Sequence, residues 1–145
     1  MLSVIVDARS GSRKLPALLA QLTAGAVDGL VREVLILAPP GEAMAAICED
    51  TGAERFDDLA AACRRARSER LMVLPEELRL RDGWIGSIND HLAAGGEAAL
   101  VEGLSKGGLF RRGPYGVLTR RDRALEGADL HVLRRRLGLR PNRVG

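Results

Sequence analysis

The feature of this chain that most constrains its fold is the alternation of short apolar runs with amphipathic segments over its first 84 residues. Most of these runs are rich in Leu, Ile and Val and end at turn-forming residues, which is typical of strands buried on both faces. Strands that alternate with helices favour a mostly parallel sheet with helices on both sides. The four predicted strands are Leu2–Asp7, Arg32–Ala38, Ala53–Phe56 and Arg70–Leu74.

The segments between and after these runs predict the helices that cover the sheet. Leu15, Leu18 and Leu22 recur at the spacing of one helix face, and residues 25–29 are expected to end that helix at its glycines. The other predicted elements are a helix over 42–51 capped by Gly52, a helix over 59–66 capped by Asp57 or Asp58, a helix over 84–92, strands over 98–102 and 117–119, and a helix over 130–137.

The predicted fold class is therefore α/β, a three-layer α/β/α arrangement of Rossmann-like type around a mostly parallel sheet. Ligands of such sheets bind beyond the carboxyl ends of the strands. The segments expected there are Asp7–Arg13, Ala38–Glu42, Pro75–Glu77 and Arg111–Tyr115.

Charge divides the chain into two unequal parts. Residues 1–105 hold 11 basic and 16 acidic residues, a net charge of −5, whereas residues 106–145 hold 11 basic and 3 acidic residues, a net charge of +8. A basic tail of this kind meets an anionic partner or forms a solvated arginine-rich face. With one Trp, one Tyr and two Phe, the chain has little material for base stacking, and we do not expect it to bind nucleic acid.

Composition also limits the class of protein and the cellular compartment that we expect. A chain of 145 residues with 46% hydrophobic residues is long enough to bury one domain core. Cys48 and Cys63 are isolated, which fits small core residues in a reduced, bacterial-type cytoplasm. No apolar run approaches the roughly 20 residues of a membrane span, and the first residues lack a signal-peptide pattern. We expect a cytoplasmic protein without a transmembrane segment, and contact with a membrane surface stays open.

Seven segments stand out together, although none is specific alone: Leu2–Val6, Leu15–Leu22, Val31–Leu37, Arg70–Leu74, Asp82–Trp84, Pro114–Arg121 and Asp129–Gly138. Together they resemble a short bacterial family-2 glycosyltransferase. The resemblance implies the nucleotide-diphosphosugar transferase fold and, ancestrally, transfer of a sugar from a nucleotide-sugar donor. It implies one glycosyltransferase-like domain over residues 1–145, with 1–105 as the nucleotide-binding-type half and 106–145 as a shortened acceptor-side segment.

The positions that bind the nucleotide in this family carry other side chains here. The Asp that follows the second strand and receives the uracil or ribose falls on Ala38, which has no side-chain acceptor. The basic, glycine-containing loop after the third strand is shortened to Asp57-Asp58. Two carboxylates would repel a donor diphosphate unless a cation intervened.

The metal-binding turn of the family is also altered. Its Asp-x-Asp pattern supplies hard oxygen ligands to a divalent ion beside the diphosphate. Here the turn reads Pro75-Glu76-Glu77, which leaves Glu77 to bind Mg²⁺ or Mn²⁺ through one carboxylate. The alternative is that Glu76 and Glu77 form a solvated turn or start a helix, where the helix dipole favours them.

The acceptor base of the family, which deprotonates the attacking hydroxyl, falls on Glu126-Gly127, where the Asp is missing. Glu126 or Asp129 would have to substitute for it. Because nucleotide, metal and base positions are all altered, the resemblance implies weak or lost catalysis, a pseudoenzyme, and leaves open whether the chain is an enzyme. If it retains a ligand, we expect Asp7, Arg9 and Arg13 to line the pocket and Arg112 or Tyr115 to approach the phosphates.

Two other interpretations remain open. The segment Asp7–Pro16 is similar to the opening loop of sugar nucleotidyltransferases, in which glycines approach a triphosphate and basic side chains neutralise it. A non-catalytic binding or assembly protein on the same fold would explain the altered sites without special chemistry. A shortened acceptor half would expose apolar surface, and for this reason we expect a homo-oligomer. We predict that Trp84 packs a helix against the sheet rather than stacking on a substrate.

Overall fold

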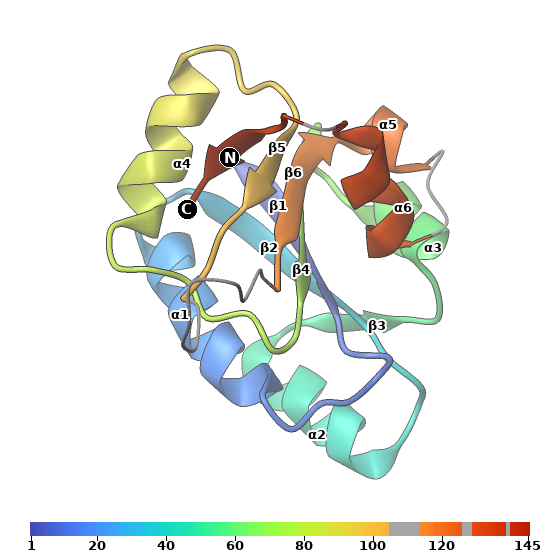
Figure 1. The fold of residues 1–145 in the computed structure, drawn as a ribbon. Helices are drawn as coiled ribbons and strands as arrows, with labels where there is room; N and C mark the ends of the chain where they lie inside the picture. Colours follow the sequence, from blue (N-terminus) through green and yellow to red (C-terminus); the bar gives the residue numbers. More distant parts are fainter. Residues whose placement is uncertain (105–113, 126–128, 139) are drawn as a thin grey trace.

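The computed structural model of the chain describes residues 1–104, 114–125, 129–138 and 140–145. Its centre is one sheet that combines strands from the beginning, the middle and the end of the chain (Figure 1). The strands are β1 (Leu2–Asp7), β2 (Val31–Leu37), β3 (Glu54–Phe56), β4 (Arg70–Pro75), β5 (Ala99–Val101), β6 (Gly116–Arg120) and β7 (Asn142–Val144).

The strand order is β3-β2-β1-β4-β6-β5-β7. The first four strands in this order are parallel, β7 is parallel to β5, and only β6 runs antiparallel to its neighbours β4 and β5. The predicted mostly parallel sheet is confirmed. Asp7 lies opposite both Leu37 and Pro75, so that β1, β2 and β4 end side by side at one edge of the sheet.

Six helices among the described residues form two layers around the sheet. One side is covered by α1, α2 and α4 and the other by α3, α5 and α6, because the helices share their buried side chains with opposite faces of the strands. The predicted three-layer α/β/α class is thereby confirmed. The helices are α1 (Leu15–Val27), α2 (Glu42–Thr51), α3 (Leu59–Arg65), α4 (Trp84–Ala93), α5 (Arg121–Leu125) and α6 (Leu130–Arg136).

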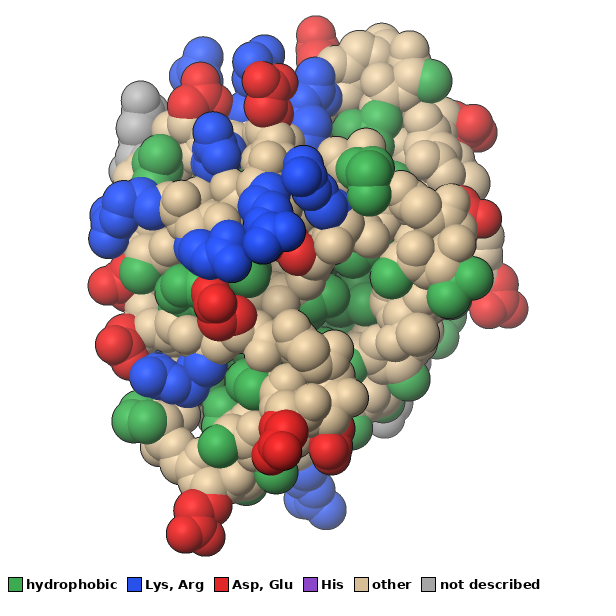
Figure 2. Space-filling model, turned by 180° about the vertical axis from the view of Figure 1, so that it is seen from behind, with side chains coloured by type: hydrophobic (Ala, Val, Ile, Leu, Met, Phe, Trp, Pro, Cys, Tyr) green, Lys and Arg blue, Asp and Glu red, His purple; other side chains and the backbone are tan. Residues whose placement is uncertain are grey.

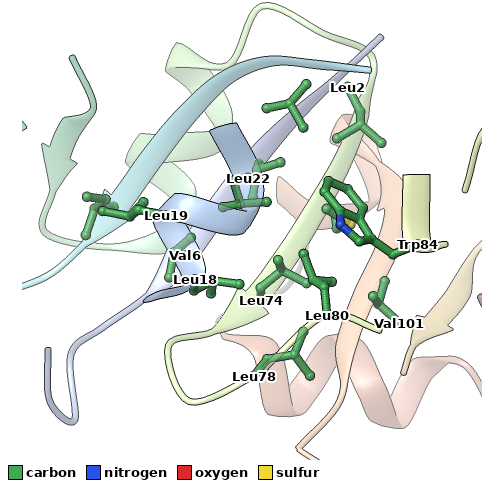
Figure 3. Packing of buried hydrophobic residues seen from close by; sticks show 14 of the residues in the cluster. Leu2, Val6, Leu18, Leu19, Leu22, Leu74, Leu78, Leu80, Trp84 and Val101 are labelled. Carbon is green, nitrogen blue, oxygen red and sulfur yellow. The ribbon is translucent and has the colours of Figure 1, made fainter. Parts of the chain in front are cut away.

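Trp84 anchors the larger of the two cores (Figure 3). Its side chain is 6% exposed and packs among leucines of α1 and of the sheet. A Cβ atom on Gly25 would lie 2.5 Å from the end of the indole, so α1 has no side chain where the ring passes. The prediction that Trp84 packs a helix against the sheet is confirmed, and α1 ends at Val27, within the predicted range 25–29.

The structure adds two short elements that the sequence did not predict. Helix α5 follows β6 without a break, and β7 pairs only with β5 at the edge of the sheet. Both lack the apolar periodicity on which a prediction rests: β7 buries only Val144, and α5 buries only Ala124. Their positions depend on partners distant in sequence, since β7 pairs with β5 and α5 packs mainly against α3.

Candidate functional site

The carboxyl edge of the parallel strands collects most of the polar residues singled out in the sequence. Asp7 ends β1, Glu76 and Glu77 follow β4, and Tyr115 precedes β6, which begins at the same edge because it runs antiparallel to β4. The adjacent strand ends hold their backbone together, since the Glu76 amide donates to the Asp7 carbonyl at 3.1 Å. Side chains from three strands therefore meet at one edge.

Asp7 and Arg9 form a bidentate ion pair at this edge. The Arg9 guanidinium donates Nε to Oδ1 of Asp7 at 3.0 Å and Nη2 to Oδ2 at 2.9 Å, and the Arg9 amide donates to Oδ1 at 3.1 Å. Burial by itself raises the pKa of Asp7, but the hydrogen bonds from Arg9 and the charges of Arg9 and Arg134 outweigh it and hold this pKa below its ordinary value. The carboxylate is thus ionised and already satisfied by the protein.

Arg134 of α6 is a second cation beside this pair. It is half-buried, and its Nε donates to the Tyr115 carbonyl at 2.8 Å, with Nη2 donating to the same oxygen. Burial lowers the pKa of Arg134, while the negative charges of Glu77 and Asp7 act in the opposite direction. Two guanidinium groups from different elements therefore lie near the Asp7 carboxylate.

Glu76 and Glu77 differ sharply although they are neighbours. The Glu76 side chain is buried, and its carboxylate accepts from the Lys14 amide at 2.9 Å. Arg79 donates Nη2 to the Lys14 carbonyl at 2.8 Å, so the segment after β4 fixes the loop between β1 and α1. Glu77 is exposed. The alternative of a solvated turn or helix start is wrong for Glu76, because its carboxylate is a buried support and α4 begins only at Trp84.

The ends of β2 and β3 are joined by an arginine. Arg55 donates to the Ala38 carbonyl at 3.0 Å and to Asp57 Oδ1 at 2.6 Å. Asp58 accepts from the Ala61 amide at 2.7 Å and so caps α3. Of the two carboxylates predicted to face a phosphate, one is thus held by a cation and the other by a helix terminus.

The remaining predicted site residues are placed as follows. Arg13 is exposed on the loop before α1. The half-buried Tyr115 ring lies under the Arg143 guanidinium, 5.6 Å from Cζ to the ring centre. The Asp129 carboxylate accepts from the Val132 amide at 3.0 Å and caps α6. Arg112 and Glu126 lie outside the described residues. The structure brings together Asp7, Arg9, Asp129 and Glu77, because the carboxylates among them act by their charge on Arg9 or on Arg134. Tyr115 joins this group through its carbonyl, which accepts from Arg134.

Two residues of this edge were not predicted as site residues from the sequence. Arg134 belongs to the basic tail for which the sequence suggests an anionic partner or a solvated face, yet it follows Leu130 by four residues and so lies on the helix face of Leu130 and Leu133. That spacing was the available signal. For Glu76 there was none, because its burial depends on the loop that approaches it from α1.

The side chains present do not form a metal site by themselves. Within the part of the chain that the structure describes, no group of three or more His, Cys, Asp or Glu residues is arranged to hold an ion. Asp7 is taken by Arg9, and Glu77 offers one carboxylate. A single carboxylate holds Mg²⁺ or Mn²⁺ only together with phosphate oxygens of a ligand. The role of Glu77 in metal binding stays a prediction.

A hollow in the surface lies away from these residues. It measures about 920 Å³ and is bordered by α1, by α2, by residues 31–35 of β2 and by Glu54 at the start of β3. Figure 2 shows it from behind, as a depression with an apolar floor beside a group of basic side chains. Its described lining contains none of the predicted site residues. Concavity alone therefore does not locate the candidate site, and we place the site by its chemistry.

Comparison with solved structures gives the class of fold. Glucosyl-3-phosphoglycerate synthase from Mycobacterium tuberculosis, in complex with Mn²⁺, UDP and glucosyl-3-phosphoglycerate, matches with a TM-score of 0.60 and 14% identity over 84% of this chain. Mannosyl-3-phosphoglycerate synthase from Rubrobacter xylanophilus matches with a TM-score of 0.54 and 16% identity over 70% of the chain. The bifunctional IspDF from Campylobacter jejuni matches with a TM-score of 0.57 and 13% identity over 99% of the chain.

These matches show that the chain has the fold of the nucleotide-diphosphosugar transferases. The chain spans 57%, 39% and 49% of the lengths of these three proteins, respectively. No family model matches the chain, and no curated protein matches it. Among the described residues, none of the helices has both the length and the apolar character that crossing a membrane requires.

Proposed function

We propose that the protein binds a nucleotide sugar at the carboxyl edge of β1 and β4, and that it is a family-2 glycosyltransferase-like protein with weak or lost catalysis. The observation that carries the proposal is the meeting of Arg9 and Arg134 at the edge where this fold class takes its ligands. Guanidinium groups suit phosphate oxygens in charge and geometry. The fold shared with a synthase bound to UDP and Mn²⁺ supports the nucleotide as ligand.

The carboxylates at this edge support the loss of catalysis. A general base needs a carboxylate that is free to accept a proton from the acceptor. Asp7 is paired with Arg9, and Asp58 and Asp129 cap helices. Among these described carboxylates, only Glu77 has no hydrogen bond that fixes it, and its side chain is exposed. We therefore expect nucleotide binding that exceeds turnover.

Calorimetric titration with UDP, GDP and CDP, each with and without Mn²⁺, tests the proposal. We expect at least one nucleotide to bind more tightly than about 1 mM, which corresponds to about −4 kcal/mol. A dissociation constant above this value for all three nucleotides under both conditions would refute it. The titrations without Mn²⁺ test the role of Glu77. If an ion bridges Glu77 and the phosphates, the nucleotide should bind more weakly without Mn²⁺, and also to the Glu77→Ala variant.

A matched pair of variants locates the binding. Arg9→Ala removes one guanidinium from the candidate site, and Arg64→Ala removes an exposed arginine from α3. We expect a loss of about tenfold in nucleotide affinity for the first variant and little change for the second. Equal losses would indicate a general charge effect. Release of nucleotide from a sugar donor at rates of about 1 s⁻¹ or more, typical of working enzymes, would contradict the loss of catalysis.

The nucleotidyltransferase interpretation rests on the loop before α1. Arg13 and Lys14 are exposed there, and the loop backbone is held by Glu76 and Arg79, as a triphosphate site would require of a fixed loop. An assay for pyrophosphate release from nucleoside triphosphates tests this second candidate. Release that falls strongly in Arg13→Ala would favour it over the glycosyltransferase-like proposal.

A further inference from the structure

A second cavity, at the opposite edge of the sheet, is surrounded by arginines. It measures about 560 Å³, within the range of small-molecule sites. Its floor is closed by Val117, Thr119 and Leu133, all at most 6% exposed. Because Arg70 begins β4 and Arg120 ends the antiparallel β6, the cavity lies where the parallel strands start. It is thus separated from the candidate site by the length of the strands.

The charges around this cavity are strongly unequal. Among its described lining residues, Arg70, Arg120, Arg123 and Arg136 are basic and only Glu97 is acidic. The nearest carboxylate contact of Arg120 is with Asp122, 3.9 Å away between two exposed side chains, and such contacts contribute little. Without counting Arg136, three arginines and one glutamate give the described lining a formal charge of +2, and such an environment attracts anions.

One of these arginines is fixed in place before any ligand arrives. Arg70 donates Nη2 to the Gly95 carbonyl at 3.1 Å and Nη1 to the Gly96 carbonyl. A guanidinium has five donors, so these two bonds orient the group and leave other donors for a ligand. The loop between α4 and β5 thus holds one wall of the cavity in a defined position.

We propose that this cavity binds a small molecule with two or more phosphate groups. Phosphate groups carry a charge of about −1.5 to −2 each at neutral pH, so they offset the positive charge of the lining. Several arginines around one opening allow bidentate contacts with phosphate oxygens. The proposal is independent of the nucleotide site, since the two share no described residue.

A single-stranded nucleic acid is disfavoured as the occupant. Its binding without sequence preference uses aromatic side chains on which bases stack, and the described lining includes no aromatic residue. A concave wall with a buried apolar floor also fits a compact ligand better than a flat bilayer surface. The ligand class is therefore a small phosphorylated compound.

Inorganic pyrophosphate is a suitable probe, titrated into the full chain and followed by amide chemical shifts. We expect saturable shifts at residues 95–98 and at Thr119, which line the cavity. The variant Arg120→Ala/Arg123→Ala, which alters two exposed side chains, should lose at least tenfold in affinity. The variant Arg32→Ala/Arg64→Ala removes the same charge from exposed positions elsewhere and should stay within twofold of the wild type.

Three outcomes would overturn the proposal. Shifts confined to residues 7–14 would assign pyrophosphate to the candidate nucleotide site alone. Equal losses in the two double variants would indicate a general charge effect. Binding of an oligonucleotide or of phosphatidylglycerol vesicles that depends on Arg120 and Arg123, without saturable binding of pyrophosphate, would assign the surface to a macromolecule or a membrane. If the double variant fails to fold, Arg123→Gln tests the same expectation with a smaller change.

Discussion

Arginine side chains have different surroundings at the carboxyl ends and at the amino ends of the parallel strands. At the carboxyl edge, Arg9 is paired with Asp7 and Arg55 with Asp57. At the amino edge, where the parallel strands start, the described lining of a cavity holds four arginines and one acidic residue. Seen from behind, basic side chains gather in the upper half of the molecule, toward the amino ends of the parallel strands (Figure 2). The arginine-rich composition therefore does not give one diffuse basic surface: at one end of the strands arginines are paired with carboxylates, and at the other the described cavity lining holds more basic than acidic side chains.

The largest effect is expected from the buried support of the carboxyl edge. Glu76→Ala removes the acceptor of the Lys14 amide and leaves that donor unsatisfied, which should lower the free energy of unfolding by about 2–3 kcal/mol. The neighbouring Glu77→Ala alters an exposed side chain and should stay within about 0.5 kcal/mol of the wild type. Urea unfolding measures both. Similar losses in the two variants would contradict the structural role of Glu76.

At the amino edge the corresponding support is a glycine. Gly96 has φ +62, and a Cβ atom there would meet the Arg70 guanidinium. Gly96→Ala should therefore destabilise the protein by about 1–2 kcal/mol, through the left-handed backbone and the displaced arginine. Gly86→Ala on α4, where a Cβ meets nothing within 4 Å, should instead be neutral or stabilise the helix by up to about 1 kcal/mol. The thermal unfolding temperature should fall for Gly96→Ala and stay level or rise for Gly86→Ala, and an equal fall in both variants would contradict this expectation.

The Asp7–Arg9 pair predicts a dependence on acid pH. The pKa of Asp7 is held below its ordinary value in the folded protein, so the pair stabilises the fold fully above the unfolded pKa of about 3.9. This contribution is lost as the pH falls through the lower folded pKa. In Asp7→Asn, the free energy of unfolding measured in urea should therefore fall less steeply below about pH 4 than in the wild type. Asp90→Asn, on the exposed side of α4, controls for the loss of a carboxyl group, and parallel curves for wild type and Asp7→Asn would contradict the prediction.

The smallest effect concerns retention on a polyanionic matrix. Arg9→Ala removes a charge that Asp7 already matches, whereas Arg123→Ala removes one from the side of the cavity with excess positive charge. We expect the Arg123 variant to elute at lower salt than the Arg9 variant, because unmatched cations dominate contacts with polyanions. A larger shift for Arg9→Ala would reverse the comparison between the edges.

Much of the first half of the fold could be predicted from local patterns. Helix α2 has the predicted bounds, Gly52 is its left-handed cap with φ +73, and Asp58 is the cap of α3. These features depend on residues within one turn of each other, so the sequence contains their full cause. Strand β2 was predicted within one residue at each end, since a buried run has a clear apolar signature.

The candidate site was predicted only in part. Asp7 and Tyr115 could be placed at strand ends from the sequence, and the structure brings them to one edge. That Asp7 is occupied by Arg9 and that Arg134 reaches the same edge depend on loop and helix placement. A side chain is reactive or satisfied according to its neighbours in space, which no spacing along the chain specifies.

The alternation of apolar runs and amphipathic segments by itself determined that this protein forms a layered α/β fold, because each run must bury both faces and each helix one. Only the tertiary structure decided the surroundings of the polar side chains. Glu76 is a buried support, Asp129 caps a helix, and four arginines border one cavity. The physical reason is that burial of apolar faces is set by local periodicity, whereas the balance of charges depends on which distant segments approach each other.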